Sequence, residues 1–140
     1  MKGVMNMVKL TDNILEAMGN LKTFYLATAS KDGVPNVAPM GAVFVKDPET
    51  IWIQDNFMMK TIANVEENPK AALSVYGAGA KGCFQIKADV TVKKSGPELA
   101  EMKALIEKMK PGLPGKSLLI LKVTGVYQCM PGPEAGKKLL

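Results

Sequence analysis

Apolar and polar residues alternate with period two over several short runs, and three other stretches repeat apolar residues every three or four positions. The first pattern predicts half-buried strands and the second predicts amphipathic helices. Strands are expected at 23–29, 35–45, 51–53, 71–76, 83–92 and 117–127, and helices at 11–19, 56–65 and 95–109. Because most strands are joined by hairpins, the pattern predicts a mainly β antiparallel barrel with flanking helices. A chain of 140 residues, 47% apolar, suits one domain over 1–140.

The central strand–turn–helix stretch carries the first candidate chemistry. Asn56 is expected to cap the helix, which places Lys60 and Thr61 in its first turn. Free backbone N–H groups, the helix dipole and a lysine together favour an anion such as a phosphate. The alternative is that Lys60 and Thr61 are solvated residues on an ordinary helix. Asp55 opposes phosphate binding unless its carboxylate points away.

The predicted strand at 35–45 contains Pro35 and Pro39, followed by Gly41. Proline cannot donate to a sheet ladder, so this strand is expected at an edge, bulged or split. Such a strand leaves main-chain N–H and C=O groups free to pair with a planar polar ring. A plain β-bulge is the other reading.

Charge and composition narrow the function classes. The formal net charge is +5, every cation is lysine, and the chain has no arginine and no histidine. Nucleic-acid binders use arginine contacts and aromatic stacking, so no nucleic-acid partner is expected. Without histidine, the usual general base at neutral pH and every Ser-His or Cys-His pair are missing. Any chemistry is therefore expected to come from a cofactor.

The N-terminal residues, the lengths of the apolar runs and the two cysteines predict where the protein is found and whether it binds a metal. The first nine residues resemble no signal peptide, and no apolar run reaches the roughly 18–20 residues of a membrane span. A cytoplasmic protein without a membrane partner is expected. Cys83 and Cys129 are far apart in sequence and form no metal-binding motif, so no metal site is predicted. Each is expected to be a reduced core residue or a redox-sensitive thiol.

In this order, these features resemble the split-barrel flavoproteins of the pyridoxamine 5′-phosphate oxidase-like superfamily, particularly their small FMN-binding proteins. The resemblance spans roughly 21–127, and the lysine–threonine pair at the helix start is its most telling element. The matching segments are 24–29, 32–35, 59–65, 68–69 and 84–88.

The resemblance implies an antiparallel FMN-binding split barrel that forms a homodimer, with FMN in clefts at the subunit interface. Lys60 and Thr61 would bind the FMN phosphate, and Asp55 and Asn56 would lie near the phosphate or the ribityl chain. The remaining implied cofactor-binding residues are Val37, Ala38, Pro39 and Met40, through main-chain groups facing the flavin ring, Met59 beside the site, and Gln85 and Tyr127 across the dimer.

Three functions are compatible with the sequence. The first is an FMN-dependent oxidoreductase or electron-transfer protein supplied by a small-molecule or protein electron donor. The second keeps the barrel but binds a deazaflavin or haem, and the absence of histidine weakens haem. The third is a binding or sensing module that uses Cys83 and Cys129. Authentic pyridoxamine phosphate oxidases bind the substrate phosphate with arginine and histidine. This chain has neither residue, which argues against pyridoxamine phosphate oxidase activity. No catalytic acid or base is assigned.

Overall fold

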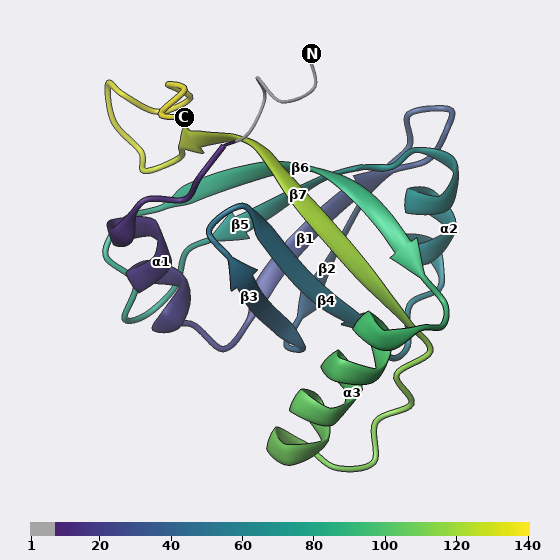
Figure 1. Ribbon diagram of the computed structural model, residues 1–140. Coiled ribbons are helices and arrows are strands. Elements are labelled where there is room, and N and C mark those ends of the chain that lie inside the picture. Colours follow the sequence, from purple (N-terminus) through teal and green to yellow (C-terminus); the bar gives the residue numbers. More distant parts are fainter. Residues whose placement is uncertain (1–7) are drawn as a thin grey trace, which may run out of the picture.

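The computed structural model describes residues 8–140 and shows one curled antiparallel sheet with three helices around it (Figure 1). The strand order is β2-β1-β5-β6-β7-β4-β3. This confirms the predicted mainly β antiparallel barrel. None of the helices in this part of the chain is long and apolar enough to cross a membrane. The elements in order are α1 (Asp12–Gly19), β1 (Phe24–Ala29), β2 (Pro35–Met40), β3 (Val43–Asp47), β4 (Thr50–Asp55), α2 (Lys60–Glu67), β5 (Lys70–Val75), β6 (Phe84–Lys93), α3 (Pro97–Met109) and β7 (Ser117–Gln128).

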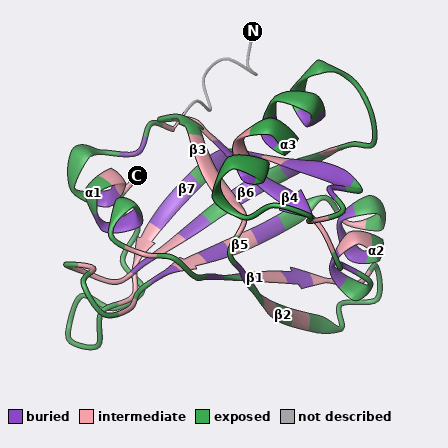
Figure 2. Cartoon of the chain, turned by 90° about the horizontal axis from the view of Figure 1, so that it is seen from below, coloured by how far each residue is buried: buried purple, intermediate pink, exposed green. Residues whose placement is uncertain are grey.

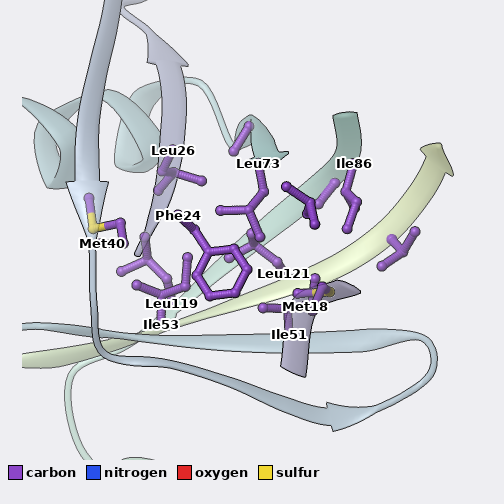
Figure 3. Packing of buried hydrophobic residues seen from close by; sticks show 14 of the residues in the cluster. Met18, Phe24, Leu26, Met40, Ile51, Ile53, Leu73, Ile86, Leu119 and Leu121 are labelled. Carbon is purple, nitrogen blue, oxygen red and sulfur yellow. The ribbon is translucent and has the colours of Figure 1, made fainter. Parts of the chain in front are cut away.

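The main core fills the inside of the curled sheet. Figure 3 shows side chains from β1, β4, β5, β6 and β7 converging there, with Met18 of α1 at one end. β4 is buried on both faces: Ile51 and Ile53 point into this core, whereas Trp52 packs with Met102 of α3 and Leu118 of β7. Burial on both faces explains why Ile51, Trp52 and Ile53 form a continuous apolar run within β4.

The sheet opens between β2 and β3. The single strand expected over 35–45 is two strands, separated by Gly41 and Ala42, so the sheet has seven strands and not six. β2 pairs with β1, and β3 pairs with β4 at the opposite edge of the sheet. Figure 2 shows β2 as an exposed outer strand. Since Pro39 cannot donate a hydrogen bond, its position on an edge strand follows from its chemistry.

The start of α2 differs from the expected one. Asn56 does not cap the helix, because α2 begins at Lys60 and the capping position is Met59. The Oδ1 atom of Asn56 accepts hydrogen bonds from Gln54 Nε2 at 2.9 Å and from the Gly115 N–H at 3.0 Å. Asn56 therefore ties the end of β4 to the segment before β7.

The C-terminal segment folds back on its own chain. The Gln128 N–H donates to the Lys137 carbonyl at 2.8 Å, and the Leu139 N–H donates to the Val126 carbonyl at 2.8 Å. Tyr127 and Lys138 form an antiparallel bridge. The backbone groups of this C-terminal segment therefore bond to β7 of the same chain, so the segment is not frayed.

Candidate functional site

An open cleft of about 410 Å³ lies where β2, the break in the sheet and the approach to α2 meet. Its size falls within the usual range for small-molecule sites, roughly 300–1,000 Å³. Both main-chain and side-chain polar groups line it, together with exposed apolar side chains. The lining residues are Asn36, Val37, Ala38, Pro39, Met40, Gly41, Ala42, Gln54, Asn56, Phe57, Met58, Met59, Lys60 and Thr61.

Among residues 8–140, β2 pairs with β1 alone, so its other edge presents main-chain groups without a strand partner. The Ser30 N–H donates to the Val34 carbonyl at 3.0 Å, which sets the hydrogen-bonding phase of the β1–β2 pair. In this hydrogen-bonding pattern, the main-chain N–H and C=O groups of the even-numbered residues of β2 face β1. The main-chain groups of the odd-numbered residues point away from β1. The N–H of Val37 and the carbonyls of Val37 and Pro39 therefore lie on the free edge. These groups offer one donor and two acceptors to a flat polar ligand.

The N-terminus of α2 adds groups suited to an anion. The N–H groups of its first turn have no partner inside the helix. Lys60 is exposed and forms no ion pair within residues 8–140, whereas Thr61 is only 4% exposed. An ammonium, a hydroxyl and the positive end of the helix dipole thus meet at one end of the cleft.

A partly buried amide network fixes the hydroxyl of Thr61. Asn36 Nδ2 donates to Thr61 Oγ1 at 3.1 Å and to Thr28 Oγ1 at 3.2 Å. Asn64 Nδ2 donates to the same Thr28 oxygen at 3.0 Å. Because Thr61 Oγ1 accepts from Asn36, its own hydrogen remains available to another acceptor. The network therefore presents Thr61 as a donor toward the cleft.

Gln54 brings an unpartnered acceptor to the same cleft. Its side chain is 4% exposed, and its Nε2 donates to Asn56. Its Oε1 is the one buried side-chain nitrogen or oxygen without a hydrogen-bond partner among residues 8–140. An unpaired buried acceptor costs about 1–3 kcal/mol. A ligand that donates to Gln54 Oε1 would recover this free energy.

The carboxylate of Asp55 is directed away from the cleft. Asp55 is 3% exposed, and it accepts hydrogen bonds from the Met58 N–H and from Ser117 Oγ, both at 3.0 Å. Lys116 Nζ lies 3.8 Å from Asp55 Oδ1. These three partners reduce the repulsion that was expected between the Asp55 carboxylate and a bound phosphate. Asp55 instead holds the turn that leads to α2.

Most of the residues expected at the cofactor site line this cleft; they are Val37, Ala38, Pro39, Met40, Asn56, Met59, Lys60 and Thr61. Asp55 lies beside it but is not part of the lining. Gln85 and Tyr127 lie elsewhere on the sheet.

Gln85 and Tyr127 belong to a cross-strand row that starts at Pro39. Pro39 pairs with Tyr25, Tyr25 with Ser74, Ser74 with Gln85, and Gln85 with Tyr127. Residues paired in this way share one face of the sheet. At about 4.8 Å per strand, Gln85 lies about 14 Å and Tyr127 about 19 Å from β2 along the sheet. Within one chain, neither is placed beside Lys60.

Six residues that line the cleft were not predicted as site residues; they are Asn36, Gly41, Ala42, Gln54, Phe57 and Met58. Asn36 follows the proline that starts β2, and Gln54 directly follows the apolar run of β4. A polar residue inside a strand otherwise buried on both faces was a usable signal for Gln54. Asn36 had no comparable signal, because its partner Thr61 is 25 residues away.

The family of the chain follows from comparison with known proteins. The family model described as "Pyridoxamine 5'-phosphate oxidase" matches residues 10–130, so the chain belongs to this family. A protein of Methanocaldococcus jannaschii, described as uncharacterized protein MJ0282, is 41% identical over 135 residues. The match covers 94% of this chain and 89% of that protein.

Solved structures with the same fold carry different descriptions. An FMN-binding protein from Syntrophomonas wolfei has a TM-score of 0.72 at 17% identity and covers 92% of this chain and 91% of its own. The heme storage protein HutZ of Vibrio cholerae has a TM-score of 0.67 at 20% identity, with 86% and 95% covered. An F420 reductase has a TM-score of 0.62 at 18% identity, with 80% and 94% covered. At these identities, the likeness is one of fold.

Proposed function

We propose that this protein binds FMN in the cleft between β2 and the start of α2, and that it is an FMN-dependent oxidoreductase or electron-transfer protein. The observation that carries the proposal is the convergence of Lys60, Thr61 and the α2 N-terminus with the free edge of β2 on one cleft. A phosphate and a flat, hydrogen-bonding ring joined by a flexible polar chain match these two ends. The FMN-binding protein of the same fold supports this assignment.

Each part of the cleft has a distinct task in this proposal. Lys60 and Thr61 bind the phosphate, and Asn36 orients the Thr61 hydroxyl. Val37 and Pro39 supply main-chain groups at the edge of the ring, and Ala38 and Met40, whose main-chain groups bond to β1, line the cleft between and beside them. Bound FMN supplies one- and two-electron transfer, so the protein needs no general acid or base of its own. This suits a chain without histidine.

A homodimer completes the site in this proposal. The outer face of β1 and β2 carries exposed apolar side chains, with Val37 65% and Tyr25 48% exposed, and Tyr76 is 57% exposed just beyond β5. Exposed apolar patches of this kind commonly mark interaction surfaces. Gln85 and Tyr127 share this face with Pro39. A second copy on this face would bring its own Gln85 and Tyr127 toward the cleft.

Two other cofactors are the main alternatives. An F420 reductase has the same fold, and F420 also carries a phosphate and a flat ring system, so the cleft chemistry suits a deazaflavin as well. A heme storage protein also has this fold, but no histidine is available here as an axial ligand. A third alternative concerns the role and not the cofactor: the protein would be a non-catalytic binding module.

A parallel binding experiment separates these cofactors. Ligand-free protein is titrated with FMN, riboflavin, F420 and haem, and binding is measured by calorimetry. The proposal predicts the tightest binding for FMN and weaker binding for riboflavin, which lacks the phosphate. Tighter binding of F420 or haem than of FMN would contradict the assignment.

A second experiment separates a redox protein from a passive binder. The FMN-loaded protein is mixed anaerobically with NADH, NADPH, or a small electron-carrier protein, and the oxidised-flavin absorbance is followed. Bleaching on addition of a donor, and its recovery with oxygen, supports a redox role. A flavin that no donor reduces supports a binding or sensing module.

A further inference from the structure

The two cysteines lie opposite each other on neighbouring strands. β6 and β7 pair with Phe84 opposite Gln128, and one step further this register places Cys83 opposite Cys129. The Cys129 N–H donates to the Cys83 carbonyl at 2.9 Å, which confirms the pairing. The sequence separation of 46 residues hid this proximity.

The pair has the separation that a disulfide requires. Directly opposed residues of a hydrogen-bonded antiparallel pair have Cα atoms about 5.5 Å apart, with side chains on one face. Disulfides join Cα atoms about 4.4–6.8 Å apart. Both cysteines are free thiols and both are partly exposed. The pKa of the Cys83 thiol is raised by burial and also by Cys129, which places the two sulfur atoms within electrostatic reach.

We propose that Cys83 and Cys129 form a reversible dithiol–disulfide site that exchanges with small-molecule disulfides. One thiolate attacks a sulfur atom of the small disulfide, forms a mixed disulfide and releases one small thiol. The second cysteine then attacks the protein sulfur and releases the second small thiol. The protein loses two electrons and two protons, and the small disulfide gains them as two thiols.

The site is separate from the cleft. The start of β6 and the end of β7 lie at the α1 end of the sheet, and α2 lies at the other end (Figure 1). The disulfide would join the glycine-rich loop at 77–82 to the C-terminal segment. This segment already bonds to β7, and Asn20 Nδ2 already donates to the Gly79 carbonyl at 3.2 Å. The disulfide would therefore hold together the glycine-rich loop, the C-terminal segment and Asn20. Its formation does not depend on FMN.

The test treats the native, reduced protein with oxidised glutathione, traps remaining thiols with an alkylating agent, and measures the intact mass. The proposal predicts a monomeric chain lighter by two hydrogen atoms, without glutathione. Trypsin should then release peptides 82–87 and 123–137 as one disulfide-linked pair, which dithiothreitol separates. Free thiols, chains joined to one another, or glutathione held on both cysteines would overturn the proposal.

Single variants provide the matched control. In Cys83→Ser and Cys129→Ser, the remaining thiol has no partner, so glutathione should stay bound to it as a stable mixed disulfide. If the native chain behaves like these variants, the two cysteines do not react with each other and the proposal is wrong.

Discussion

Asn36 Nδ2 lies 3.1 Å from Thr61 Oγ1, so a residue of the exposed edge strand positions a hydroxyl at the start of α2. The same amide donates to Thr28 Oγ1 at 3.2 Å, and Thr28 also accepts from Asn64. β1, β2 and α2 are therefore joined by polar contacts at one end of the cleft. This network couples the shape of the cleft to the stability of the fold.

Asn36→Ala should weaken both properties. It removes two side-chain hydrogen bonds, so we expect the free energy of unfolding in urea to fall by about 1–3 kcal/mol. FMN affinity should fall several-fold because the Thr61 hydroxyl is no longer oriented, whereas riboflavin affinity should change little. Equal losses for FMN and riboflavin would show that Asn36 does not act through the phosphate end of the site.

Lys60→Ala tests the anion site directly. A charge-assisted hydrogen bond is worth about 1.5–3 kcal/mol, so FMN affinity should fall roughly ten- to a hundredfold. Lys31→Ala removes an exposed lysine of the β1–β2 turn and serves as the control. Fluorescence titration of both variants gives the comparison. Unchanged FMN affinity in Lys60→Ala would remove Lys60 from the site.

Gln54→Met should weaken FMN binding with little effect on stability. Gln54 Oε1 has no partner among the described residues, so an apolar side chain of similar size removes an unsatisfied buried acceptor. The substitution also removes the hydrogen bond from Gln54 Nε2 to Asn56 Oδ1, which offsets this gain, so we expect the stability of the ligand-free protein to change by less than about 1 kcal/mol. FMN affinity should fall about tenfold if the ligand donates to this oxygen. Full FMN affinity in the variant would contradict that role.

Asp55→Asn should reduce stability and leave the binding site intact. The carboxylate accepts from the Met58 N–H and Ser117 Oγ, and hydrogen bonds to a charged group are worth about 1.5–3 kcal/mol each. Urea unfolding at neutral pH should show a loss of that order. Asp32→Asn, in the exposed β1–β2 turn, should show none. Weaker FMN binding in Asp55→Asn at unchanged stability would indicate a direct role in the cleft.

The sequence predicted the elements well because each depends on local patterns. The prolines of β2, the apolar run of β4 and the stripe of α3 each act over a few residues. The start of α2 was predicted less well. Asn56 has the chemistry of a helix cap, but its oxygen is occupied by Gln54 and by Gly115, which is 59 residues away. A tertiary contact of that range leaves no local signature.

The same limit applied to the pairs that matter for function. The Lys60–Thr61 pair was visible because both residues are adjacent at a helix start. The Asn36–Thr61 contact and the Cys83–Cys129 pairing depend on how strands and helices come together. Periodicity sets which face of a strand a residue occupies, but it does not set which residue of another strand lies opposite.

The most direct test of the FMN assignment is the absorption spectrum of the purified protein, repeated after denaturation, with the released chromophore identified by mass. We predict an oxidised-flavin spectrum and released FMN, close to one per chain. A protein that is colourless as purified and remains without flavin absorbance after addition of FMN and removal of the excess would contradict the account.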